Sequence, residues 1–198
     1  MEMRKAPFQR LVDLLVAVPL GLVALPLCLV LLVLIRLETP GAPLFVQTRV
    51  GRNRQPFAML KLRTMQAGTV QAASHEVGAA TITRMGAFLR RTKLDELPQL
   101  WNVITGDMSL VGPRPCLPVQ EDLIAERASR GLFAIRPGVT GPAQLAGIDM
   151  SQPRRLAEVE AAYFGQPRPL ADLPLILRTV LGGGSGDAAR ADGQEPKR

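Results

Sequence analysis

Two adjacent acids, Asp95 and Glu96, are notable because of the charges that precede them. The stretch from Arg49 to Lys93 contains nine Lys or Arg residues and a single acid, Glu76. Carboxylates among so many cations can hold a divalent ion, or one of them can attack a phosphoryl group whose charge the cations offset. The pattern therefore predicts a site for phosphate chemistry centred on the acid pair.

Each half of this pattern also has a simpler interpretation. The basic stretch alone would suit a surface that contacts anionic lipid headgroups, at ~1 kcal/mol per charge near the bilayer. Thr92 or Asp95 could cap a helix that has Pro98 in its first turn, where a missing N–H donor costs nothing. Capping gives a reason for one carboxylate but not for two. The readings are compatible, because a carboxylate at a helix N-terminus stays ionised and able to attack.

Two further turns each carry an arginine. Arg114 lies between Pro113 and Pro115, which fix the backbone around it, and this suits a guanidinium that must be held over a phosphate. Arg136 opens a Pro- and Gly-rich segment at residues 136–141. A rigid turn with a solvated arginine is the alternative for both.

The elements that must position these residues begin with an apolar run. Residues 14–35 contain no charge, and a straight helix of that length covers ~33 Å, about the hydrocarbon thickness of a bilayer. The run is longer than the ~7–15 apolar residues of a cleaved signal peptide. It is therefore predicted to be a membrane segment.

The flanks of the run bear on its topology. Basic residues stand on both sides of it, with Arg4, Lys5 and Arg10 before it and Arg36, Arg49, Arg52 and Arg54 after it. Because Lys and Arg are normally in excess on the cytoplasmic side only, two basic flanks favour both ends on that side. Pro19 and Pro26 can each kink a helix, and a bend near Pro26 would return the chain to the same face. From composition alone, a re-entrant and a spanning helix remain equally open.

Composition excludes several classes of protein. The chain has 198 residues and a formal net charge of +7, and its length suits one domain with appendages. Its 47% of hydrophobic residues exclude a chain that is disordered throughout. Two cysteines and one histidine exclude a disulfide scaffold and a Cys/His zinc site. Aromatic residues make up only 4%, which argues against a stacking platform for single-stranded nucleic acid, and no nucleic-acid partner is expected.

The chain is expected to divide into a membrane helix at residues 1–36, a catalytic domain at residues 37–181 and a disordered tail at residues 182–198. The fold class is α+β and mostly helical. Two β-leaning runs, residues 43–48 and 56–62, predict a hairpin, and residues 66–80 predict a loop. Proline, serine and glycine signals predict helices at residues 97–105, 118–130 and 151–164, the last with Ser151 as cap. Residues 170–181 predict an amphipathic helix at the membrane interface.

Taken together, these motifs resemble the bacterial sugar transferase family, the small monotopic phosphoglycosyl transferases. The likeness covers roughly residues 8–181 and rests on the segments at residues 45–51, 61–65, 88–103, 106–115 and 136–141. The run LDELPQLWNV followed by GDMSLVGPRP is long and unusual, so chance is a poor explanation. At this length the chain looks like the minimal catalytic core.

The resemblance implies a specific reaction. The family moves a phospho-sugar from a UDP-sugar to polyprenyl (undecaprenyl) phosphate and releases UMP, the first membrane step of polysaccharide or glycoconjugate synthesis such as that of exopolysaccharide. By likeness, Asp95 is the nucleophile and forms a covalent aspartyl-phosphosugar, which the lipid phosphate then attacks. Glu96, with Asp95 beside it, helps hold Mg²⁺. The cations implied to contact substrate phosphates are Lys61, Arg63, Arg90, Arg114 and Arg136.

The resemblance also implies a place in the cell. The family's N-terminal helix is re-entrant and breaks at a proline, which puts the catalytic domain on the cytoplasmic face of the bacterial inner membrane, in contact with membrane lipids. Here Leu25 precedes Pro26, where the family often has serine. The competing hypothesis is a non-catalytic basic anchor that binds anionic lipids and recruits partners, but an anchor has no use for paired acids among cations. Sugar identity and oligomeric state, a homo-oligomer included, stay open.

Overall fold

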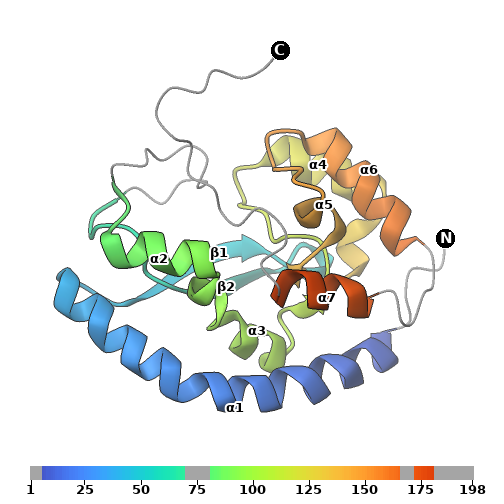
Figure 1. Ribbon diagram of the computed structural model, residues 1–198. Helices are drawn as coiled ribbons and strands as arrows, with labels where there is room; N and C mark the ends of the chain where they lie inside the picture. The colour runs from blue at the N-terminus through green and yellow to red at the C-terminus, as the bar shows by residue number, and fades with distance from the viewer. Residues whose placement is uncertain (1–5, 70–80, 166–171, 181–198) are drawn as a thin grey trace.

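The computed structural model describes residues 6–69, 81–165 and 172–180. In this part of the chain it has the expected mostly helical α+β fold, with a long N-terminal helix beneath short helices and a β-hairpin (Figure 1). The predicted tail at residues 182–198 lies outside the described residues, as does most of the predicted loop at residues 66–80.

The first element, α1, is a 33-residue helix that spans Ala6–Glu38. The helix is not interrupted at Pro26, where a break was expected. It is continuous through both Pro19 and Pro26. Instead the helix is bowed along its length and follows the surface of the elements above it (Figure 1). Curvature of this kind is usual where one side of a long helix packs on a core.

The inner side of α1 is a narrow stripe. Its buried residues are spaced by four or seven positions, about one or two helical turns, and they are Asp13, Ala17, Ala24, Leu31 and Ile35. Small side chains in the middle of this stripe let α1 lie close to helix α3 (Gln99–Thr105).

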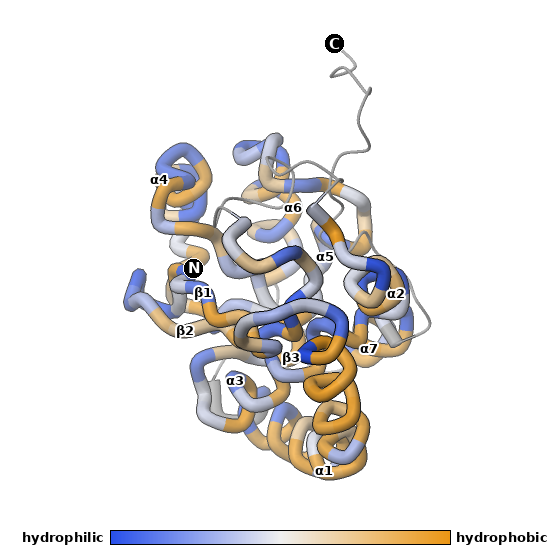
Figure 2. The backbone as a smooth tube through the Cα atoms, turned by 90° about the vertical axis from the view of Figure 1, so that its left-hand side faces the viewer, coloured by the Kyte–Doolittle hydropathy of each residue, from blue (hydrophilic) through white to orange (hydrophobic). Residues whose placement is uncertain are grey.

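The outer side of α1 is apolar and exposed. Figure 2 shows α1 as the most continuous hydrophobic segment of the described chain. The residues on this side include Leu11, Leu15, Leu22, Val23, Leu25, Leu29, Val30, Val33 and Leu37. By length and composition, α1 qualifies as a membrane segment. An apolar surface of this extent is unusual in a water-soluble monomer and is typical of contact with lipid or another protein.

The predicted hairpin is confirmed. Strands β1 (Leu44–Val50) and β2 (Pro56–Leu62) are antiparallel, and the register runs from Leu44 opposite Leu62 to Val50 opposite Pro56. A single 3₁₀ turn, η1 (Arg52–Arg54), joins them.

The helical predictions are confirmed with shorter bounds than expected. After the hairpin come α2 (Arg84–Thr92), η3 (Leu94–Glu96), α3, α4 (Glu121–Ser129), η4 (Leu132–Ala134), α5 (Pro142–Leu145), α6 (Pro153–Phe164) and α7 (Asp172–Val180). The expected Ser151 cap is wrong. Gln152 is the N-cap residue of α6, and the backbone and hydroxyl of Ser151 instead donate to the Asp149 carboxylate.

A two-stranded parallel sheet has no counterpart in the sequence prediction. Strand β3 (Ser109–Val111) pairs with β4 (Gly138–Thr140). Their junction needs glycine, because a Cβ atom on Gly138 would lie 2.0 Å from the backbone nitrogen of Gly112. The two Pro- and Gly-rich segments predicted as turns are thus brought together as neighbouring strand ends.

Candidate functional site

The acid pair lies in the short 3₁₀ turn η3, between α2 and α3. Lys93 adopts a left-handed conformation (φ 58°) that turns the chain from α2 into η3. Asp95 and Glu96 are buried, with 5% and 7% of their surfaces exposed. The N-cap residue of α3 is Pro98, so Asp95 does not occupy the capping position that was its simpler interpretation.

Two of the predicted cations converge on Glu96. The Arg114 Nη2 atom lies 3.0 Å from Glu96 Oε1, and the Lys61 Nζ atom lies 3.4 Å from the same oxygen. Lys61 comes from β2 and Arg114 from the turn after β3, so residues 35 positions and 18 positions away from Glu96 meet at its carboxylate. The fold therefore assembles part of the predicted site around Glu96.

A polar cleft adjoins this cluster. Its lining includes Arg49, Lys61, Gln99 and Arg114. Arg49 and Gln99 were not among the predicted site residues. The Arg49 guanidinium is held rigidly, because it donates to Gln47 Oε1 at 2.6 and 3.0 Å and to the Pro115 carbonyl at 3.0 Å.

The sequence places Arg49 on the same face of a strand as Gln47, but only the structure shows that this face is buried. Gln47 and Arg49 are two residues apart on β1, so their side chains project from the same face of the strand. Both are buried, at 5% and 7% exposure. A polar pair facing inward on a strand is an informative exception, because buried polar side chains need partners.

The electrostatic environment of the cleft is positive. Burial lowers the pKa of Lys93, the Arg114 guanidinium lowers it further, and the Glu96 carboxylate opposes both effects. Several guanidinium and ammonium groups beside two carboxylates leave an excess of positive charge, which favours an anionic ligand such as a phosphate.

The other predicted cations are placed differently. Arg90, in the last turn of α2, donates from Nε to Thr64 Oγ1 at 2.9 Å. Arg63 is turned toward the end of α1. Its guanidinium donates to the Thr39 carbonyl at 2.8 Å and to the Pro40 carbonyl at 2.9 Å, so it ties the segment after α1 to the hairpin.

Arg136 lines a second cavity near the N-terminal end of α1. Its Nε atom donates to the Gly106 carbonyl at 2.8 Å, and Asp13 and Arg52 line the same cavity. Burial lowers the pKa of Arg136, and the neighbouring Arg52 and Arg10 guanidiniums add to this effect. The structure thus groups Lys61 and Arg114 with Glu96, whereas Arg63 and Arg136 donate to backbone carbonyls elsewhere.

The acid pair can be tested for its fit to Mg²⁺. Within the described ranges, no group of three or more His, Cys, Asp or Glu side chains gathers to form a protein-only metal site. Mg²⁺ commonly binds through one or two carboxylates, with substrate phosphates and water completing its octahedron. Asp95 and Glu96 supply that number of carboxylates, so the residues fit an ion shared with a phosphate-bearing substrate.

Comparisons with known proteins agree with the chemistry of this cluster. A model of the bacterial sugar transferase family matches residues 4–183. The chain is 40% identical over 185 residues to the UDP-glucose:undecaprenyl-phosphate glucose-1-phosphate transferase of Caulobacter vibrioides, covering 87% of this chain and 68% of the relative. It is 38% identical over 180 residues to the exopolysaccharide production protein PSS of Rhizobium leguminosarum, covering 81% and 86%.

A third relative is considerably longer than this chain. The UDP-N-acetylgalactosamine-undecaprenyl-phosphate N-acetylgalactosaminephosphotransferase of Aeromonas hydrophila is 32% identical over 166 residues, which cover 78% of this chain but only 38% of the relative. The family match at residues 4–183 includes the acid pair and the cations beside Glu96.

Proposed function

The chain belongs to the bacterial sugar transferase family, and from that premise we propose that it moves a phospho-sugar from a UDP-sugar to undecaprenyl phosphate. The names of two relatives pair undecaprenyl phosphate with a UDP-sugar. The observation that carries the proposal is the buried acid pair Asp95–Glu96, with Lys61 and Arg114 at the Glu96 carboxylate.

The proposed reaction has two displacements at one phosphorus. A carboxylate oxygen of Asp95 attacks the sugar-linked phosphorus of the UDP-sugar, the bond to the bridging oxygen breaks, and UMP leaves. The product is an aspartyl-phosphosugar. An oxygen of undecaprenyl phosphate then attacks the same phosphorus, and Asp95 leaves as a free carboxylate. Both displacements conserve charge and atoms and need no oxidant.

The neighbouring cations have a physical role in this scheme. Phosphoryl transfer is accelerated chiefly by positioning and by neutralising the charge of the transferring group. Lys61 and Arg114 already meet at Glu96, and the Arg49 guanidinium lines the adjoining cleft. Mg²⁺, when bound through the acid pair and the substrate diphosphate, would supply further neutralisation of phosphate charge.

The two ends of α1 support a helix that enters the membrane without crossing it. Near the N-terminal end, Arg10 Nη2 donates to the Ile104 carbonyl at 2.7 Å. At the C-terminal end, the backbone N–H of Met85 donates to Glu38 Oε1 at 3.0 Å, and Arg63 binds the carbonyls that follow. The two ends of α1 thus attach to different elements above it, α3 at one end and α2 at the other, and this favours both ends on one side of a bilayer.

We therefore place the catalytic elements on one membrane face, the cytoplasmic face of the inner membrane, where the two basic flanks of α1 are expected. The apolar outer side of α1 would lie in lipid along the uncharged residues 14–35, and the ends of the helix beyond them, beside Arg10 and Arg36, would lie at the membrane surface. Family membership favours this enzyme over the non-catalytic anchor that basic composition also allowed.

The direct test is UMP release. The detergent-purified protein is incubated with Mg²⁺ and undecaprenyl phosphate, and a panel of UDP-sugars is screened. We expect release with at least one sugar and its loss, by a factor of at least ~10³, in Asp95→Asn, because an amide cannot replace the attacking carboxylate.

The matched control is Asp122→Asn, which changes an exposed aspartate on α4 in the same way and should leave the rate unchanged. Trapping radiolabelled sugar phosphate on the wild-type chain, but not on Asp95→Asn, would support the covalent step. A wild-type rate that persists in Asp95→Asn contradicts the proposed nucleophile.

A further inference from the structure

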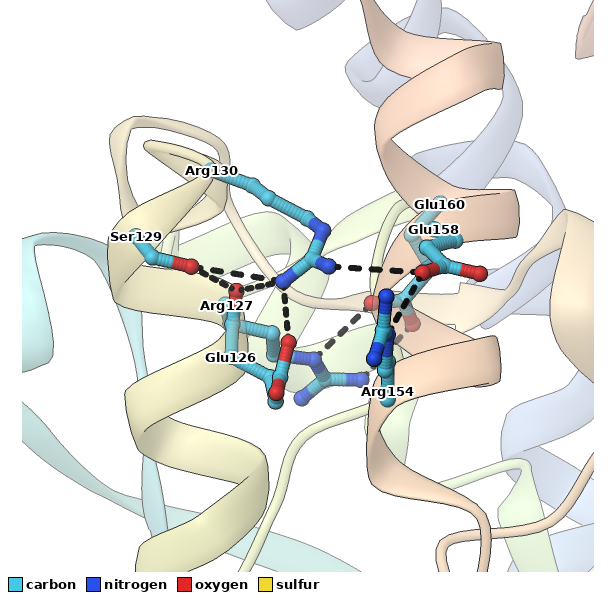
Figure 3. Close-up of polar contacts among 7 residues, drawn as sticks. All are labelled: Glu126, Arg127, Ser129, Arg130, Arg154, Glu158 and Glu160. Atoms are coloured by element: carbon cyan, nitrogen blue, oxygen red, sulfur yellow. Dashed lines mark hydrogen bonds and ion pairs between the residues drawn. The ribbon is translucent and has the colours of Figure 1, made fainter.

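Two sets of ion pairs join α4 to α6 at different depths (Figure 3). The outer set is partly exposed. Arg130 contacts Glu126 on its own helix and Glu158 on α6, and Arg154 also contacts Glu158. The inner set is one pair, Arg127 with Glu160, and the two residues are 2% and 1% exposed.

The inner pair is bidentate. Arg127 Nε donates to Glu160 Oε2 at 2.9 Å, and Arg127 Nη2 donates to Glu160 Oε1 at 2.7 Å. Burying two charges costs desolvation energy that their attraction often only offsets, and well-packed hydrophobic residues frequently serve stability as well. Stability alone therefore gives a weak reason for this pair, and its remaining contacts indicate a different role.

Besides a hydrogen bond between Arg127 and the Cys116 side chain, the pair contacts the backbone of Arg114. Arg127 Nη1 donates to the Arg114 carbonyl at 2.8 Å. The Arg114 backbone N–H in turn donates to the Glu160 carboxylate. The pair thus binds both the N–H and the C=O of Arg114. Together with the bonds between Arg127 and Glu160, these contacts form a closed ring of hydrogen bonds.

The two prolines restrict the backbone angles of this turn, but they leave it with few backbone hydrogen-bond donors. Pro113 and Pro115 lack N–H groups, so Arg114 supplies the only backbone donor across these three residues. Their carbonyls are bound from outside the turn, Pro113 by the Gly138 N–H at 2.9 Å and Pro115 by Arg49 at 3.0 Å. Without the Arg127–Glu160 pair, the middle of the turn would lose both of its anchors.

The position of the Arg114 side chain depends on how its backbone is held. Its Nη2 atom lies 3.0 Å from Glu96 Oε1. We propose that Arg127 and Glu160 are positioning residues, which fix the backbone of Arg114 so that its guanidinium is held at Glu96 and at the substrate phosphate. The inference rests on the proposed function and adds two residues that touch neither substrate nor the acid pair.

The test removes the pair without leaving a lone buried charge. In the double variant Arg127→Met/Glu160→Leu, the hydrophobic side chains keep α4 and α6 packed while Arg114 loses both backbone partners. We expect a folded protein whose kcat/KM falls by about 10-fold to 100-fold, the scale on which a small misplacement of a catalytic group acts. Arg127→Lys is the second variant, because it keeps a cation beside Glu160 but lacks the fork that reaches Arg114.

The matched control is Arg130→Met. It removes Arg130–Glu158, the outer ion pair that joins these two helices, together with the local pair Arg130–Glu126, does not touch Arg114, and should retain the wild-type rate. A cycle with Arg114→Ala separates positioning from stability. If the pair acts through Arg114, the double variant causes no further loss in the Arg114→Ala background, whereas a general structural role would give a loss of the same size in both backgrounds.

A second readout needs no turnover. Hydrogen exchange at the Arg114 amide should accelerate in Arg127→Met/Glu160→Leu and remain slow in Arg130→Met. Wild-type exchange at Arg114 in the double variant, or a wild-type rate in that folded variant, would overturn the inference. If the wild-type protein releases no UMP from any UDP-sugar, the proposed function fails, while hydrogen exchange still decides whether the pair holds Arg114.

Discussion

At the scale of single residues, arginine performs several distinct tasks in this protein. Arg114 reaches Glu96, and Arg49 lies along the cleft beside it. Arg127 binds a backbone, and Arg63 binds the carbonyls after α1. The guanidinium suits all of these because it offers five donors in a fixed planar fork and stays charged when buried.

Arg63 gives a test of this division, because family resemblance implies phosphate binding whereas its contacts are with Thr39 and Pro40. We expect Arg63→Gln to reduce the free energy of unfolding by ~1–3 kcal/mol, because the buried guanidinium's hydrogen bonds to the segment after α1 are lost, and hydrogen bonds from charged groups are of that strength. The KM for the UDP-sugar should not change. Thermal unfolding in detergent and steady-state kinetics provide the two measurements.

The control for this variant is Arg155→Gln, which alters an exposed arginine on α6. A raised KM in Arg63→Gln together with an unchanged unfolding temperature would assign Arg63 to phosphate binding after all.

At the scale of elements, α1 has two sides with opposite requirements. The inner stripe is tight because small residues such as Ala17 and Ala24 let the helix approach α3. The outer side has no such restriction and carries large apolar residues. Sequence hydropathy alone cannot separate the two sides, since both are apolar.

A matched pair of substitutions distinguishes them. Ala17 is fully buried and its neighbour Val18 is 39% exposed. Ala17→Phe should destabilise the protein by ~1–3 kcal/mol or more, because an added ring must push α1 away from the core. Val18→Phe should be tolerated. Thermal unfolding of the two variants in the same detergent makes the comparison, and equal losses of stability would contradict the inner stripe.

At the scale of the whole molecule, α1 lies beneath the catalytic elements along its full length instead of projecting away from them (Figure 1). Polar contacts fix it at both ends, through Arg10 on one side and Glu38 on the other. This arrangement predicts that the start and the end of α1 are both accessible from the same face of the membrane.

Cysteine labelling in cells tests that arrangement. In a Cys28→Ala background, Leu11→Cys and Leu37→Cys lie near opposite ends of α1, and both positions are exposed. We expect a membrane-impermeant thiol reagent to label both from the cytoplasmic side of inverted vesicles and neither from outside intact spheroplasts. Val23→Cys, in the middle of the outer side, should resist labelling because it faces lipid. Labelling of the two ends from opposite sides would establish a spanning helix instead.

Local patterns explain which parts of the fold were predictable. The hairpin and four of the helices follow from signals within a few residues. Gly106 is one example: it predicts the end of α3, and in the structure it adopts the left-handed conformation that ends the helix. The expected interruption at Pro26 did not occur, because packing along the inner side holds α1 together as a curved helix. The parallel pair β3–β4 was missed because its three-residue strands are nearly thirty positions apart and carry no periodic pattern.

The sequence by itself was enough to predict a site for phosphate chemistry, since the adjacent acids Asp95 and Glu96 and an arginine between two prolines are recognisable as a pattern of residue types. Only the tertiary structure decided which cations lie beside the Glu96 carboxylate. Lys61 and Arg114 meet at Glu96, whereas Arg63 and Arg136 bind carbonyls. Arg127 and Glu160 bind the backbone of Arg114. The reason is physical: a charge is recognisable from its residue type, but its partners depend on distances that long-range packing sets.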